Sequence, residues 1–134
     1  MPKVVFPHML KDEVEIWKRF RQIDPIPFLK LDYDVHVGTL PSGLGPLTPE
    51  MESLARAIYR KRIDVVGETE DEVWIIEIKP RAGMSTLGQL ISYEALYEKE
   101  FSPTKPIRLA VVCERTEQDM EDLLVQYGID IYQV

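Results

Sequence analysis

The sequence lacks the features that would support a disulfide framework, a membrane span or a secreted protein. Its one cysteine, Cys113, ends an apolar run and is expected to be a buried, reduced thiol, which leaves no basis for a disulfide framework or a zinc site. No apolar stretch approaches the roughly 20 residues that a membrane helix needs. The segment 1–20 is too charged for a secretory signal peptide. These absences predict a cytoplasmic protein without a membrane segment.

An excess of basic residues is also lacking. The formal net charge is −7, which argues against tight non-specific binding to nucleic acid, because such binding normally uses a basic surface. The charge is unevenly distributed, however. Arginines and lysines cluster in residues 56–62 and at positions 79 and 81, whereas many acids lie in residues 68–72 and 114–122. A local basic footprint is therefore compatible with the acidic total.

The length and the hydrophobic pattern predict one domain over residues 1–134. The content of 45% hydrophobic and 29% charged residues is that of an ordinary globular protein. The expected elements are helix 12–22, strand 28–38, helix 49–60, a strand through 63–66, strand 72–79, a helix capped by Ser85 or Thr86, strand 107–113, a helix capped by Thr116, and strand 129–132. A helical crossover between strands 72–79 and 107–113 favours a parallel pair, so we expect an α/β fold with a mixed central sheet flanked by helices.

Strand 28–38 shows a regular alternation of apolar and polar residues. We expect its apolar residues to share one face of a half-buried strand near the edge of the sheet. They are Leu29, Leu31, Tyr33, Val35 and Val37.

The most informative stretch is Glu77-Ile78-Lys79, at the end of an apolar strand. Glu77 and Lys79 point to the same side of that strand, since alternate side chains share a face. Charged groups in an apolar strand are costly unless they are paired or hold a metal. Asp64 lies thirteen residues upstream in a second apolar run, with turn residues between the two. A hairpin would bring Asp64 and Glu77 together beside Lys79.

These residues resemble the core motif of the PD-(D/E)XK nuclease superfamily. Gln89 and Tyr93, four residues apart on the next helix, resemble the Gln-x-x-x-Tyr motif of its RecB-like branch. The resemblance covers residues 62–113, and Ile63 stands where the family has a proline. It implies a restriction-endonuclease-like core, with residues 12–38 as its first helix and strand and helix 49–60 as an insertion.

The resemblance also implies a set of roles. Asp64, Glu77 and the backbone carbonyl of Ile78 would hold Mg²⁺, or Mn²⁺ in its place, because hard cations prefer oxygen ligands. Lys79 would orient or deprotonate a water, or stabilise the charged phosphorane. Gln89 and Tyr93 would support these catalytic residues. A glutamate of the first helix joins the metal shell in many members, for which the candidates are Glu13, Glu15 and Glu52.

DNA is the substrate and partner that the resemblance implies, with Arg60, Arg62 and Arg81 as candidate phosphate contacts. Sequence specificity would come from a protein partner, a homo-oligomer or DNA structure. A structural ion pair is the alternative explanation of the three charged residues. The alternative functions are a catalytically silent nuclease-fold module for DNA handling or protein assembly, and an interaction domain that pairs with another copy through strand 28–38.

Overall fold

The computed structural model describes Phe6 and residues 9–134, apart from the side chain of Ile58. The predicted order of helices and strands is confirmed. The elements are α1 (Lys11–Ile23), β1 (Lys30–Val37), α2 (Pro49–Tyr59), β2 (Lys61–Glu68), β3 (Val73–Ala82), α3 (Met84–Phe101), β4 (Ile107–Thr116), α4 (Met120–Gln126) and β5 (Ile129–Gln133). Within these described ranges, no helix combines the length and the apolar character that crossing a membrane requires.

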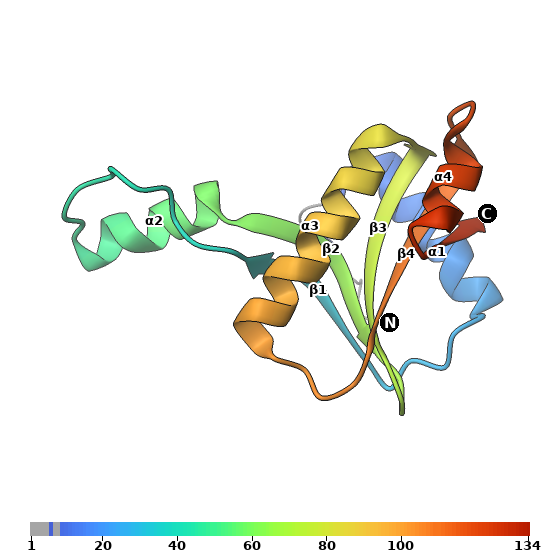
Figure 1. Ribbon diagram of the computed structural model, residues 1–134, viewed down its shortest axis with the longest axis horizontal. Coiled ribbons are helices and arrows are strands. Elements are labelled where there is room, and N and C mark those ends of the chain that lie inside the picture. Colours follow the sequence, from blue (N-terminus) through green and yellow to red (C-terminus); the bar gives the residue numbers. More distant parts are fainter. Residues whose placement is uncertain (1–5, 7–8) are drawn as a thin grey trace.

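The strands form one mixed sheet, as the sequence predicts. In the described chain the strand order is β1-β2-β3-β4-β5. β2 pairs antiparallel with β1 and with β3, whereas β3, β4 and β5 run parallel. The crossover from β3 through α3 to β4 gives the expected parallel pair. Figure 1 shows α3 in front of the sheet and α1 behind it.

Helices bury both faces of the sheet. On one face, α1 packs Ile16, Trp17 and Phe20 against strand residues such as Ile76 and Ile78. On the other, α3 and α4 cover a second cluster that includes Ile75, Val111, Leu90 and Leu124. Burying each large apolar side chain stabilises the fold by about 1.5–3 kcal/mol. Because β3 is covered on both sides, its sequence is a continuous apolar run, and the buried Glu77 is an exception to it.

Two predicted helix caps are wrong. Neither Ser85 nor Thr86 caps α3: the helix begins at Met84 with Gly83 as its N-cap, and the Thr86 hydroxyl accepts a hydrogen bond from the Gly83 N–H at 3.1 Å. Thr116 does not cap α4, because β4 continues to Thr116 in register with β3 and the helix begins at Met120. In both cases the parallel pairing of β3 with β4 extends further than the apolar run indicates.

The expectation that the apolar residues of β1 share one face is also wrong. Leu31 and Tyr33 pack on the α1 side of the sheet, whereas Val35 and Val37 pack on the α3 side. The alternation reverses at Asp34, whose φ is +54°. A left-handed residue turns the strand over, and aspartate tolerates that conformation better than most residues. β1 therefore contributes to both cores.

The backbone of Asp34 gives a first prediction. We expect Asp34→Ala to lower the free energy of unfolding by roughly 1 kcal/mol more than Asp34→Gly, because only glycine adopts the left-handed conformation without strain. Both variants lose the same carboxylate, so their difference isolates the backbone. Chemical denaturation of the two variants measures it. Equal stabilities would show that the conformation at Asp34 costs nothing.

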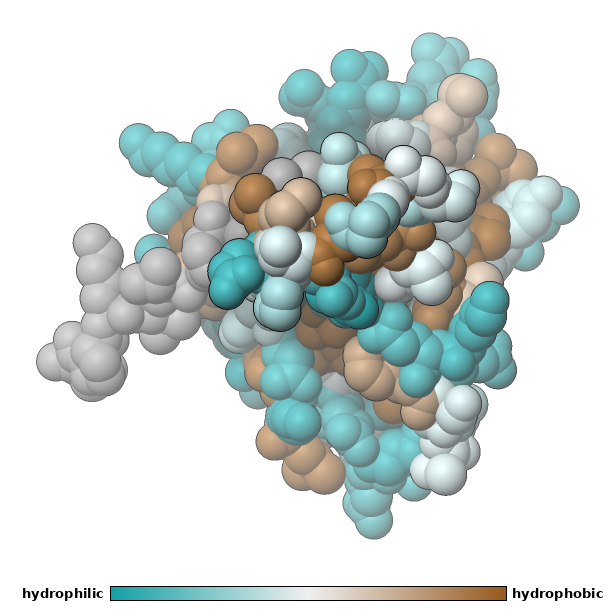
Figure 2. All heavy atoms as spheres, turned by 90° about the vertical axis from the view of Figure 1, so that its left-hand side faces the viewer, coloured by the Kyte–Doolittle hydropathy of each residue, from teal (hydrophilic) through white to brown (hydrophobic). Residues whose placement is uncertain are grey.

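Residues 38–60, here called the arm, extend away from the sheet (Figure 1). The arm contains a loop and then α2, where the Thr48 hydroxyl accepts a hydrogen bond from the Met51 N–H and Pro49 begins the helix. Among the described side chains of α2, none belongs to either core cluster. Figure 2, which faces the tip of the arm, shows apolar side chains at the surface near the centre of the view.

Candidate active site

The site begins where the ladder between β2 and β3 ends. These strands pair from Glu68 with Val73 as far as Val65 with Ile76, and a turn closed by the Thr69 N–H and the Glu72 carbonyl at 2.9 Å joins them. Both strands continue beyond the last pair, but their backbones no longer pair there. Asp64 and Glu77 occupy the next position on each strand. The predicted hairpin therefore places the two acids side by side where the strands separate.

The two carboxyl groups replace the missing backbone partners. The Ile78 N–H donates to Asp64 Oδ2 at 2.9 Å, and the Asp64 N–H donates to Glu77 Oε1 at 3.3 Å. Each carboxylate thus accepts a hydrogen bond from a backbone N–H of the opposite strand, which fixes its direction. As a result, the carboxylates of Asp64 and Glu77 are held close together by the backbones of the two strands.

Lys79 adds a positive charge to this pair. Its Nζ lies 3.8 Å from Glu77 Oε2, with 26% of the lysine side chain exposed against 3% of the glutamate. The ammonium group therefore lies between a buried carboxyl and solvent. The lysine is thus partly exposed to solvent, whereas the glutamate beside it is buried.

Burial sets the protonation of the acids. It raises the pKa of Glu77 well above its usual range, and the negative charge of Asp64 raises it further, against the opposing effect of Lys79. Burial also raises the pKa of Asp64, while the hydrogen bond from Ile78 lowers it. Because the pKa of both carboxyls is raised, protons compete with a cation for this pair.

Gln89 and Tyr93 lie on the sheet-facing side of α3. Tyr93 is buried, and its pKa is raised by burial and by the charges of Glu77 and Asp64, which places its hydroxyl in the field of the site. The Oε1 atom of Gln89 is buried and has no hydrogen-bond partner among the described residues. A buried amide oxygen without a partner is costly. It is a vacant acceptor one helical turn before Tyr93.

The structure distinguishes among the three candidate glutamates. Glu13, in the first turn of α1, receives a hydrogen bond from the Leu10 N–H at 3.1 Å. Its pKa is raised by burial, and the charges of Asp64 and Lys79 also act on it. Glu15 is exposed and pairs with Lys18, and Glu52 pairs with Arg56 on the arm. Of the three glutamates, Glu13 is the one whose carboxyl interacts electrostatically with residues of the site.

The donor set fits a hard cation with an incomplete protein shell. Within the described residues, no group of three or more His, Cys, Asp or Glu side chains is assembled to hold a metal ion. Asp64 and Glu77 supply carboxylate oxygens, and the carbonyl of Ile78 lies between Glu77 and Lys79 in the chain. Mg²⁺ commonly takes one or two carboxylates and keeps waters or phosphate oxygens as its other ligands.

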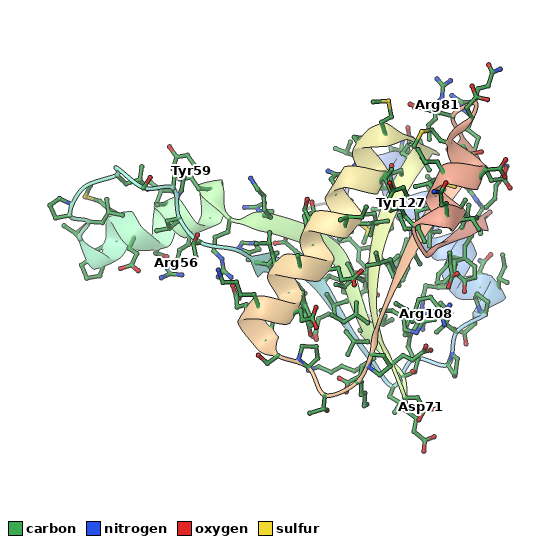
Figure 3. All side chains as sticks on the ribbon, in the orientation of Figure 1. Arg56, Tyr59, Asp71, Arg81, Arg108 and Tyr127 are labelled. Carbon is green, nitrogen blue, oxygen red and sulfur yellow. The ribbon has the colours of Figure 1, made fainter. Side chains whose placement is uncertain are left out.

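The three candidate phosphate contacts differ in availability. Arg60 binds Glu100 at 2.6 Å and donates to the His36 carbonyl at 3.0 Å, so it would have to leave that ion pair to bind a phosphate. Arg62 lies 3.9 Å from Asp34. Arg81 is exposed at the end of β3, and Figure 3 shows it projecting outward from the fold. Arg81 is therefore the most accessible of the three.

Sequence reasoning missed Asp34 as a neighbour of the site. Asp34 lies across from Asp64, between the pairs Tyr33–Val65 and Val35–Ile63, and its charge raises the pKa of Asp64. Its carboxylate is 3.1 Å from His36 Nε2. The alternating pattern of residues 28–38 places Asp34 among the polar residues, on the face opposite the apolar ones. The available signal was an aspartate in the middle of a β-branched and aromatic strand, where aspartate is uncommon.

The fold is restriction-endonuclease-like. No family model and no curated protein matches the chain. Among solved structures, it is similar to a repair endonuclease from Pyrococcus abyssi, with a TM-score of 0.57 and 17% identity over 100% of this chain and 49% of that one. It is also similar to EndoMS in a complex with double-stranded DNA, with a TM-score of 0.55 and 15% identity over 99% and 48% of the two chains. The chain thus spans about half the length of these proteins, and the likeness establishes the fold.

Proposed function

We propose that this protein is a metal-dependent nuclease that hydrolyses DNA phosphodiester bonds. The observation that carries the proposal is the meeting of Asp64 and Glu77 where β2 and β3 separate, with the Lys79 ammonium 3.8 Å from Glu77. Such a group of two acids and a cationic side chain suits phosphate chemistry. The similarity in fold to a repair endonuclease and to a DNA-bound EndoMS supports this choice.

Each residue of the site would have its own role in the reaction. Asp64, Glu77 and the Ile78 carbonyl would hold the cation, with Glu13 beside them. A bound Mg²⁺ or Mn²⁺ would supply Lewis-acid chemistry, lowering the pKa of a water and offsetting charge on the phosphate. Lys79 would position that water, accept its proton or stabilise the negative charge of the transition state. Gln89 and Tyr93 would orient these groups from α3, and Arg81 would contact the DNA backbone.

A cleavage assay tests the proposal. We expect supercoiled plasmid or single-stranded DNA to be cut in the presence of Mg²⁺ or Mn²⁺ and to stay intact with a chelator. Asp64→Asn is expected to lower the cleavage rate by at least about a hundredfold, because it removes a ligand charge at nearly constant shape. Absence of cleavage of either DNA with both metals would contradict the enzymatic proposal.

The net charge of −7 favours one second candidate, a catalytically silent module for DNA handling or protein assembly. DNA binding measured by fluorescence anisotropy separates the two. The silent module would bind DNA equally well with Mg²⁺ or with a chelator and would leave it uncut. The nuclease would bind more tightly when the cation is present, since the cation offsets repulsion between the acids and the phosphates.

A further inference from the structure

The arginines of the described chain differ in whether an acid partners them. Six form an ion pair with an aspartate or a glutamate: Arg19, Arg21, Arg56, Arg60, Arg62 and Arg108. Among the described residues, no carboxylate and no hydrogen-bond acceptor partners the guanidinium group of Arg81 or of Arg115, and both side chains are exposed. Acids outnumber lysines and arginines in this chain by 23 to 16, so an arginine without an acid is unexpected.

These two arginines are neighbours in the sheet. β3 and β4 run parallel, and Arg81 is the register partner of Arg115. Neighbouring strands lie about 4.8 Å apart and register partners project to the same face, so the two guanidinium groups leave the sheet side by side. Like charges in such positions repel each other. An anion bound between them would remove that repulsion.

The arginine pair lies next to the candidate active site. Arg81 follows Lys79 by two residues on β3, which corresponds to about 7 Å along the strand. Figure 3 shows Arg81 projecting from the end of the fold. The Lys79 ammonium is 3.8 Å from Glu77, whereas the two arginines have no such partner in the described chain. An anion held by the arginines would therefore lie beside the site and leave its lysine in place.

Acidic residues that follow β4 limit the affinity of this surface for anions. Glu114 is held by Arg19 at 3.3 Å. The carboxylate of Glu117 lies beside Gly83, at the start of α3, and the Glu117 N–H donates to the Ala82 carbonyl at 2.8 Å. These negative charges weaken the local positive potential without pairing with the two arginines. We therefore expect modest, salt-sensitive binding rather than a tight anion site.

We propose that Arg81 and Arg115 together hold one phosphate group of the DNA strand, next to the bond that is cleaved. The planar fork of donors in arginine matches phosphate oxygens better than a lysine ammonium does. An internal phosphodiester and a terminal phosphate present this same chemistry. The inference rests on the proposed function, which makes DNA the ligand, and it adds Arg115 to the residues that position the strand.

DNA binding in the presence of a chelator tests the arginine pair without any cleavage. Fluorescence anisotropy at low ionic strength compares internally labelled duplexes that carry either a phosphate or a hydroxyl at their ends. Arg81→Ala and Arg115→Ala should each weaken binding at least about threefold, and the double variant at least about tenfold, because a phosphate contact is lost. In the double variant, the slope of log affinity against log salt should fall by about 1.

Matched variants make this experiment specific. Arg21→Ala combined with Arg56→Ala removes the same charge from exposed, ion-paired arginines and should leave the affinity within about twofold of the wild type. Arg81→Lys combined with Arg115→Lys keeps both charges and should recover most of the affinity. An equal loss on both duplexes assigns the arginine pair to an internal phosphate. A loss confined to the phosphorylated duplex assigns it to a terminal phosphate.

A cleavage assay separates this inference from the proposed function. The double alanine variant should raise KM and leave kcat nearly unchanged, since the contact is present in the bound DNA and in the transition state alike. A double variant that binds both duplexes as the wild type does would overturn the inference, as would wild-type protein that binds neither duplex at low salt. If plasmid DNA stays intact while the double variant loses binding, the proposed function fails and this inference stands.

Discussion

Replacing Lys79 with alanine is expected to abolish DNA cleavage while leaving the fold and cation binding intact. We expect a loss of about a thousandfold in the cleavage rate, which is typical of removing one charged group that acts in the transition state. Lys79 contacts Glu77 from the partly exposed rim of the site and packs into neither core, so its loss should change the free energy of unfolding by less than about 1 kcal/mol.

Two controls make the Lys79→Ala experiment specific. Lys18→Ala removes an exposed lysine of α1, paired with Glu15, and should leave the rate within about twofold of the wild type. Thermal unfolding of both variants checks the fold. A Lys79→Ala protein that cuts DNA at the wild-type rate would show that the lysine belongs to a structural ion pair with Glu77.

Replacing Glu77 with glutamine is expected to stabilise the metal-free protein and to eliminate its activity. Glu77 is nine-tenths buried or more, and burial, with the charge of Asp64, raises the pKa of its carboxyl. Glutamine keeps the shape without an ionisable group. We expect the free energy of unfolding to rise by roughly 0.5–2 kcal/mol near pH 8 in the presence of a chelator. This is the range usual when a substitution removes one functional residue that destabilises the fold. Glu70→Gln, in an exposed turn, is the control and should leave the free energy of unfolding unchanged.

The sign of the pH dependence follows from the raised pKa of Glu77. Between the unfolded value of 4.5 and the higher folded value, the folded state binds more protons than the unfolded state. The free energy of unfolding therefore falls as the pH rises through this window. In Glu77→Gln this contribution is absent, so the two proteins should converge at low pH and diverge towards pH 8. Denaturation in chelator at several pH values measures the difference. Parallel curves would contradict the burial cost assigned to Glu77.

Much of the candidate site follows from local sequence. The hairpin of β2 and β3 is specified by two apolar runs separated by turn residues, and antiparallel pairing then fixes which positions meet. Asp64 and Glu77 are brought together for that reason. The parallel pairing of β3 with β4 follows from the helix between them. Both pairings follow from the local pattern of apolar and turn residues, which can be recognised in a single sequence.

Other parts depend on contacts that the sequence does not reveal. The face switch in β1 rests on the left-handed Asp34, because one residue changes which side of the sheet its neighbours cover. The choice of Glu13 over Glu15 and Glu52 depends on how α1 lies across the sheet. The helix of the arm has the sequence pattern of an ordinary amphipathic helix. The structure adds that, within the described residues, its side chains lie outside both core clusters.

The most direct test of the central claim is a calorimetric titration of the wild type and of Asp64→Asn with Mn²⁺ and Mg²⁺, without DNA. We expect a cation site in the wild type, with proton release on binding, because the raised pKa of Glu77 makes protons compete with the cation for its carboxyl. In Asp64→Asn the affinity should fall at least about tenfold. Equal binding by both proteins, or no binding by the wild type, would contradict the assignment of Asp64 and Glu77 as ligands.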